Sequence, residues 1–189
     1  VLEHYRMDLL EKNLLNVQIP TQKLKIIARL IGYNEHPDYN TDIINNDIRK
    51  LGFTNVDDPV YEYFMNFIDN NAYCLPVWLI NAELSVKVEY LSAYQSKNGT
   101  NMCDGELESI IVTDKIMIEE GIQYMNQIKN MFNDFNIKCD IKTVETNMND
   151  VNIVLVFDNS DENLLKYADT ISYYYCDIKR TESAPVIEY

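Results

Sequence analysis

Histidine and cysteine are the residue types that most often carry nucleophilic or metal chemistry, and this chain of 189 residues uses both sparingly. It has only His4 and His36, both in its N-terminal part. Its four cysteines lie about 30 residues apart with no CxxC or Cys–His spacing. This pattern predicts free thiols and argues against a zinc site and against histidine-based catalysis. The five glycines form no phosphate-cradling motif, so no cofactor is expected.

Carboxylates offer a different chemistry. Asp114 ends the apolar run "SIIVTD", and Asp150 lies at the turn "TNMND" before a second run. In palm-type polymerases and cyclases, two carboxylates at one end of a sheet bind the cations that clamp a triphosphate. The structural explanation is that Asp114 and Asp158 precede helices and cap them. A metal-dependent, palm-type nucleotidyl enzyme with Asp114 and Asp150 as metal ligands is therefore a further alternative.

Basic side chains gather only in residues 20–52, where five Lys or Arg face four acids. Two capped helices are expected there, at 22–31 and 42–51, and they could form a helix-turn-helix-like unit within 21–52. The candidate DNA contacts are Lys23, Lys25, Arg29, Arg49 and Lys50. A DNA-binding regulator is thus the alternative function, although a small bundle with solvated lysines explains the same residues.

Tyrosines are numerous, 14 in all, and cluster in "DPVYEYF" and "ISYYYCD". A helix cannot bury three consecutive tyrosines, so some are expected to be exposed, and exposed tyrosine beside acids is typical of protein-binding surfaces. The candidate contact residues are Tyr61, Tyr63, Tyr173 and Tyr174. A codon bias toward an AT-rich genome explains the excess equally well.

The net charge of −14 limits the partners. A strongly negative surface repels phosphate backbones, so nucleic acid is not expected as a partner except through residues 21–52. A basic protein fits better. The longest apolar runs have five or six residues, too short to cross a membrane, and no signal peptide is visible. An intracellular, cytoplasmic protein is expected.

Periodicity divides the chain at its middle. Residues 1–72 have helical spacing, with helices also expected at 2–15 and 59–70, and are predicted to form a helical unit. Residues 83–189 are predicted to form an α+β domain. Its expected elements in chain order are a strand at 83–94, a strand at 107–114, a helix at 116–135, strands near 137–143 and 152–157, a helix after Ser160, and a last strand at the C-terminus.

The two neighbouring strands in "IKCDIKTVETNMNDVNIVLVF" differ in exposure, and the difference predicts their positions. Their short link requires a hairpin, and the strand–helix–strand segment before it requires a right-handed crossover. A ferredoxin-like (split βαβ) antiparallel or mixed sheet with two helices on one face satisfies both. The apolar strand is then central, and the alternating, lysine-bearing strand lies at an edge.

These features favour a non-catalytic interaction protein that binds another protein through an acidic, tyrosine-rich surface. The composition further suggests a viral or phage component of an AT-rich genome.

Overall fold

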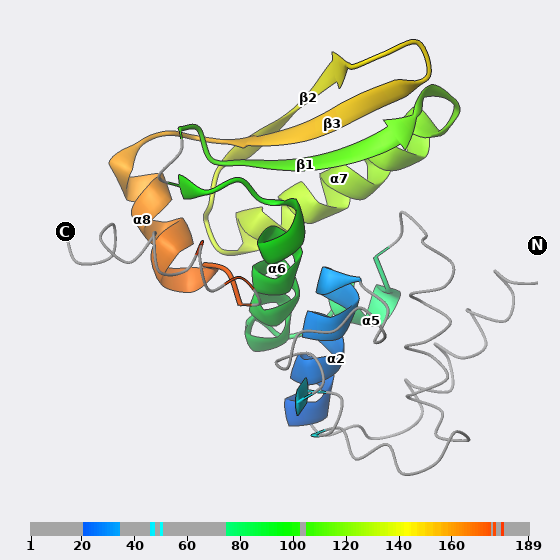
Figure 1. Ribbon diagram of the computed structural model, residues 1–189. Helices are drawn as coiled ribbons and strands as arrows, with labels where there is room; N and C mark the ends of the chain where they lie inside the picture. The colour runs from blue at the N-terminus through cyan, green and yellow to red at the C-terminus, as the bar shows by residue number, and fades with distance from the viewer. Residues whose placement is uncertain are drawn as a thin grey trace, which may run out of the picture.

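The computed structural model describes residues 21–34, 46–47, 50, 75–102, 105–174, 176 and 179 (Figure 1). The elements in chain order are α2 (Thr21–Tyr33), α5 (Val77–Ile80), α6 (Leu84–Asn98), β1 (Glu108–Asp114), η3 (Lys115–Met117), α7 (Ile118–Asp134), β2 (Cys139–Glu145), β3 (Asp150–Phe157) and α8 (Asp161–Thr170). The helices expected at 2–15 and 59–70 and the C-terminal strand lie outside the described residues. None of the described helices is long and apolar enough to cross a membrane.

The three strands form one antiparallel sheet in the order β1-β3-β2. Ile111 pairs with Ile153 between β1 and β3, and Ile141 pairs with Leu155 between β2 and β3. The β1-α7-β2 crossover followed by the β2–β3 hairpin is the split βαβ arrangement. The predicted α+β class is confirmed.

Sheet position explains why the neighbouring strands differ in composition. β3 has a partner on each side, and Ile153 and Leu155 are fully buried. β2 has a partner on one side among the described residues, and its second half from Lys142 to Glu145 is exposed. The alternating pattern with lysine therefore belongs to an outer strand, as predicted.

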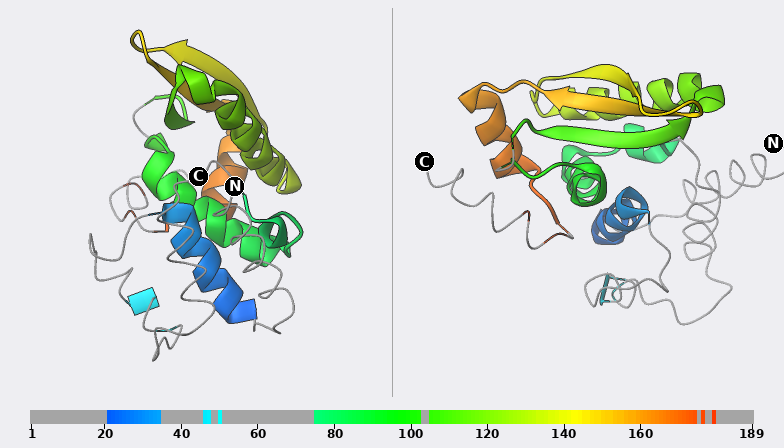
Figure 2. Two further views of the ribbon diagram at one scale, coloured as in Figure 1. Left: turned by 90° about the vertical axis from the view of Figure 1, so that its right-hand side faces the viewer. Right: turned by 45° about the horizontal axis from the view of Figure 1, so that its top comes forward.

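Helix α7 packs on one face of this sheet, and the two form a layered unit with α2 and α6 lying side by side beyond it (Figure 2). Met125, Ile128 and Phe132 of α7 are completely or almost completely buried. A Cβ added at Gly121 of α7 would meet the end of the Ile153 side chain, so the helix lies very close to the central strand. Helix α8 lies at one end of the sheet, where Tyr167 packs against Phe157.

The prediction of a strand at 83–94 is wrong, because residues 84–94 form the first part of helix α6. The alternation of Val86, Val88 and Tyr90 suggested a period of two. In the structure, burial follows neither a period of two nor one face of a helix, because every residue from Tyr90 to Ser96 is buried. Asn98-Gly99 consequently ends a helix and does not form a hairpin turn.

Helix α2 packs along α6. Its buried residues run continuously from Ile26 to Gly32, which means that it is enclosed on all sides over two turns. The buried residues of α2 and α6 join those of the sheet and α7 in one hydrophobic cluster. The division into units 1–72 and 83–189 stays a prediction.

Candidate functional site

Among the described helices, α7 packs on one face of the sheet, and these helices leave the opposite face uncovered (Figure 2). Val154 at the centre of that face is nevertheless only 3% exposed. We call this uncovered face the open face and define it by the outward side chains of the three strands. These are Glu108, Ile110, Val112, Asp114, Asp140, Lys142, Val144, Asp150, Asn152, Val154 and Val156. Side chains alternate between the faces of a strand, and the intervening residues of β1 and β3, such as Ser109, Ile111, Ile153 and Leu155, are buried.

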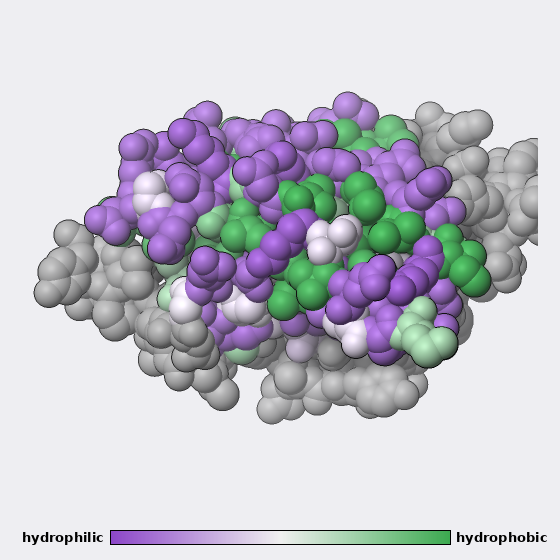
Figure 3. All heavy atoms as spheres, turned by 90° about the horizontal axis from the view of Figure 1, so that it is seen from above, coloured by the Kyte–Doolittle hydropathy of each residue, from purple (hydrophilic) through white to green (hydrophobic). Residues whose placement is uncertain are grey.

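The centre of the open face is apolar. Val112 is 59% exposed and Val144 is 43% exposed, and they flank Asn152 in one row because Val112 and Val144 both pair with Asn152. Seen from above the sheet, hydrophobic side chains gather in the middle of the molecule and hydrophilic ones surround them (Figure 3). An exposed apolar patch with a polar rim is typical of an interaction surface.

Charged side chains lie toward the ends of the open face. At one end, Lys142 of β2 lies 3.2 Å from the carboxylate of Glu108 on β1. At the other end, Asp114 and Asp150 are register partners on β1 and β3. The row through Asn152 carries no charge, while the row beside it has one charged member, Lys142, which pairs with Val154.

A cleft of about 540 Å³ opens beside the end of β2 where Asp140 lies. Lys129, Asn133, Lys138 and Asn159 line it together with Cys139, Asp140, Val156, Phe157 and Asp158. Lys129 forms an ion pair with Asp140 at 3.0 Å. The ammonium group of exposed Lys138 makes no ion pair or hydrogen bond with the residues that the structure describes. The cleft therefore places one exposed cation, Lys138, at the border of the open face, where its charge adds to the hydrogen bond from Lys166 in lowering the pKa of Glu162.

The structure places both carboxylates of the palm-type alternative at one end of the sheet, as that alternative required. Each is engaged in a turn: Asp114 accepts a hydrogen bond from the backbone N–H of Ile116, and Asp150 accepts one from the side chain of Asn147. The capping role predicted for Asp114 is confirmed. Among the described residues, no group of three or more His, Cys, Asp or Glu is arranged to hold a metal ion.

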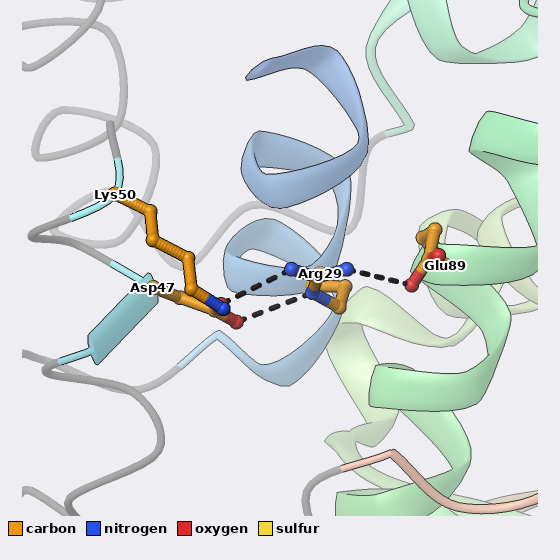
Figure 4. Close-up of polar contacts among 4 residues, drawn as sticks. All are labelled: Arg29, Asp47, Lys50 and Glu89. Atoms are coloured by element: carbon orange, nitrogen blue, oxygen red, sulfur yellow. Dashed lines mark hydrogen bonds and ion pairs between the residues drawn. The ribbon is translucent and has the colours of Figure 1, made fainter. Parts of the chain in front are cut away.

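The basic residues of the helix-turn-helix alternative do not form a reading face around Arg29. Arg29 is only 8% exposed, and its guanidinium contacts Asp47 at 3.1 Å and Glu89 at 3.1 Å (Figure 4). Burial alone lowers the pKa of Arg29, but its hydrogen bonds to the two carboxylates outweigh this and raise it. Arg29 thus joins α2 to α6, and its charge is not available to DNA.

The other members of that basic set have separate positions. Lys23 is exposed and Lys25 half-buried on α2, and Lys50 lies 3.8 Å from Asp47. Arg49 lies outside the described residues.

Of the four tyrosines proposed as protein contacts, the structure describes Tyr173 and Tyr174. Tyr173 is completely buried, and its hydroxyl donates to the backbone oxygen of Thr100 at 2.7 Å. The ring of Tyr174 lies 4.4 Å from the Arg29 guanidinium, a cation–π contact. Tyr173 therefore offers no surface to a partner, while Tyr61 and Tyr63 lie outside the described residues.

Comparison with protein-family models gave no match, and neither did comparison with curated proteins. Among solved structures, the chain is similar to the crystal structure of I-DmoI in complex with DNA and Ca, with a TM-score of 0.56 and 12% sequence identity. The match covers 88% of this chain and 99% of the I-DmoI chain. At this identity the similarity concerns the fold.

This similarity corrects three expectations drawn from the sequence. I-DmoI is a homing endonuclease, and its structure was solved with DNA. The prediction of a non-catalytic, protein-binding module of a virus or phage, the classification as a non-enzyme, and the expectation that nucleic acid is a partner only through residues 21–52, if at all, are therefore overturned. Those arguments relied on the absence of common catalytic motifs and on the net charge, and neither criterion identifies a fold.

Apart from Asp114 and Asp150, the residues of the open face were not identified as site residues from the sequence. The segment "NIVLVF" (152–157) reads as a strand buried on both faces, and nothing in its composition shows that Asn152 is an outward residue. The useful signal was the register implied by the short β2–β3 link, which places Val144 beside Asn152.

Proposed function

We propose that this protein binds duplex DNA through the open face of its sheet. The observation that carries the proposal is the fold similarity to I-DmoI in complex with DNA, which extends over 88% of the chain. Antiparallel strands are an established means of reading DNA grooves. The open face is the one surface where all three described strands present side chains together.

The shape of the open face suits a groove. Neighbouring strands lie about 4.8 Å apart, so a row across three strands spans roughly 10 Å, comparable with the width of the major groove, about 12 Å. The row Val112–Asn152–Val144 is uncharged and at least partly exposed. Apolar and amide side chains are suited to base edges, whereas phosphates need cations.

The cations nearest the open face lie along β2 and the adjacent cleft. Lys142 lies on the face, and Lys129 and Lys138 line the cleft beside its end. We assign phosphate contacts to Lys138 and Lys142. Because Lys142 has Glu108 as a neighbour and the chain has a net charge of −14, affinity should be modest and greatest at low salt.

The test is fluorescence anisotropy of a short labelled duplex at about 50 mM salt with Ca²⁺ present, where electrostatic contacts are strong. Charge reversal of Lys138→Glu together with Lys142→Glu should weaken binding by about tenfold or more, because two phosphate contacts become repulsive. The matched control reverses the same number of charges on α2, Lys23→Glu with Lys25→Glu. The first turn of α2 lies at the end of the helix pair away from the sheet (Figure 1).

The outcomes separate the two surfaces. If the α2 variant keeps its affinity for the duplex and the sheet variant loses it, the result supports DNA binding by the open face. The reverse result would place DNA on the helices and overturn the proposal, as would no retention of duplex by the wild-type protein. Incubation of the same duplexes with Mg²⁺ shows, in addition, whether bound DNA is cut.

A further inference from the structure

The central row of the open face has a chemical preference among bases. It consists of Asn152 on β3 with Val112 of β1 and Val144 of β2 as its register partners. We infer that this row makes the protein select A·T base pairs, an inference that rests on the proposed DNA binding.

Asn152 is the polar member of the row, and its amide is available. Its side chain is half-buried between its neighbours, and within the part of the chain that the structure describes it makes no hydrogen bond. The two valines are exposed and fixed on a paired sheet, so they limit where a base edge can sit. When a ligand supplies both hydrogen bonds to a partly buried amide that lacks them, the free energy of the complex falls.

An asparagine amide matches adenine. Adenine presents the N7 acceptor and the N6 donor side by side in the major groove, and the amide offers one donor and one acceptor. Guanine presents two acceptors, N7 and O6, which would leave the amide oxygen of Asn152 facing another acceptor. Arginine and lysine are the usual readers of guanine. No arginine belongs to the open face, and its lysine, Lys142, forms an ion pair with Glu108.

The flanking valines match the partner base. The C5-methyl group of thymine is the apolar feature of the major groove, and Val112 and Val144 place methyl groups beside Asn152 from the two outer strands. The next row toward the cleft adds Ile110, which pairs with Val154. The row thus offers a hydrogen-bonding group for adenine flanked by apolar contacts for thymine.

The experiment measures anisotropy with two duplexes of equal length, one A·T-rich and one G·C-rich. The wild type should prefer the A·T-rich duplex by about tenfold, the discrimination of one good bidentate contact. Asn152→Ala should lose that preference while binding the G·C-rich duplex as before. The control is Asn126→Ala, which removes an exposed asparagine amide from α7. This variant should keep the preference for the A·T-rich duplex.

Two base analogues identify the contacts. Replacing adenine by 7-deazaadenine, which lacks N7, should weaken binding by the wild type but not by Asn152→Ala. Replacing thymine by uracil, which lacks the methyl group, should weaken binding by the wild type but not by a Val112→Ala, Val144→Ala double variant.

The possible failures are distinct. If no duplex binds, the proposed function fails. If both duplexes bind equally, or if 7-deazaadenine has no effect, DNA binding stands and the inference about Asn152 is overturned. Sedimentation velocity adds one further check: a dimer that Val112→Glu converts to monomer would show that a second copy covers the face, which also overturns the inference.

Discussion

The carbonyl oxygen of Tyr90 on α6 occupies the space that a Cβ atom at Gly32 of α2 would fill. Ala93, one turn further along α6, lies against the same point. The two helices can approach this closely because neither presents a large side chain there. The contact lies on the side of the helix pair that faces away from solvent, since Gly32 is among the buried residues of α2.

Gly32→Ala should therefore destabilise the protein, by about 1–3 kcal/mol, because the added methyl group meets backbone that cannot rotate away. The measurement is the free energy of unfolding in urea. Gly121→Ala on α7 is the matched control. Its Cβ would come too close only to the terminal methyl group of Ile153, which can move, and would lie at ordinary contact distance from Thr113. Helix propensity favours alanine at both sites. Equal effects of the two substitutions would contradict the account of the helix contact.

Arg29 is predicted to be the main polar determinant of the same helix pair. Replacing it with methionine removes both hydrogen bonds from Arg29 to Asp47, which is 1% exposed. Breaking a buried ion pair in this way costs about 3–5 kcal/mol, and the exposed Lys50, 3.8 Å from Asp47, offsets part of that loss. Arg29→Lys should restore only part of this, since one ammonium cannot form the parallel bonds that the guanidinium makes to both Asp47 oxygens. Thermal unfolding followed by circular dichroism should rank the stabilities as wild type, then Arg29→Lys, then Arg29→Met.

Lys166→Met is the control for Arg29, because it removes a cation from the exposed pair with Glu162 on α8. Exposed pairs contribute about 0–1 kcal/mol. A loss at Lys166 as large as that at Arg29 would show that burial does not set the difference.

Cys139 gives a pH-dependent prediction. Burial raises the pKa of its thiol from 9.0 to about 12, and Lys129 only partly opposes this. The folded protein therefore holds the proton more tightly than the unfolded chain. The resulting stabilisation is complete below pH 9 and is lost progressively as the pH rises from 9 toward 12.

The measurement uses two single-thiol variants, one retaining only Cys139 and the other only Cys176, which is less buried. At pH 8, Cys139 should react with a disulfide reagent much more slowly than Cys176, because little thiolate forms and little of its surface is accessible. In urea above the unfolding transition the two rates should converge. Fast labelling of Cys139 in the folded protein would contradict its assigned burial.

Asn163 of α8 should be required to hold the end of the sheet that borders the cleft. Its side chain accepts a hydrogen bond from the backbone N–H of Lys138 at 2.7 Å and donates to the backbone oxygens of Lys138 and Asp158. Asn163→Ala removes all three hydrogen bonds made by a side chain that is only 4% exposed. The Lys138 oxygen keeps the bond from the backbone N–H of Asp158, but the Lys138 N–H and the Asp158 oxygen lose their bond to Asn163. The free energy of unfolding should therefore fall by about 2–4 kcal/mol. Chemical denaturation measures this.

The exposed neighbour Asn159 provides the comparison for Asn163. Asn159→Ala should change stability by less than about 0.5 kcal/mol. If Asn163→Ala proves equally mild, the three hydrogen bonds do not anchor α8 to the start of β2.

The sequence by itself determined the local elements wherever one periodicity was unambiguous. The apolar stripe that includes Met125, Ile128 and Phe132 predicted α7. The contrast between "IKCDIKT" and "NIVLVF" predicted an outer and a central strand. It failed at 84–98, because Val86, Val88 and Tyr90 fit a period of two over the few residues that were read as a strand. Only packing against α2 distinguishes the helix from the strand there.

What the tertiary structure decided was which side chains remain available to a partner. Arg29 and Tyr173 look like surface residues in the sequence, but packing of α6 beside α2 and of Tyr173 against Tyr167 encloses them. Asn152 looks like part of a buried run, but α7 covers only one face of its strand. Exposure depends on contacts between segments far apart in the chain, and those contacts are not encoded in the composition of any one segment.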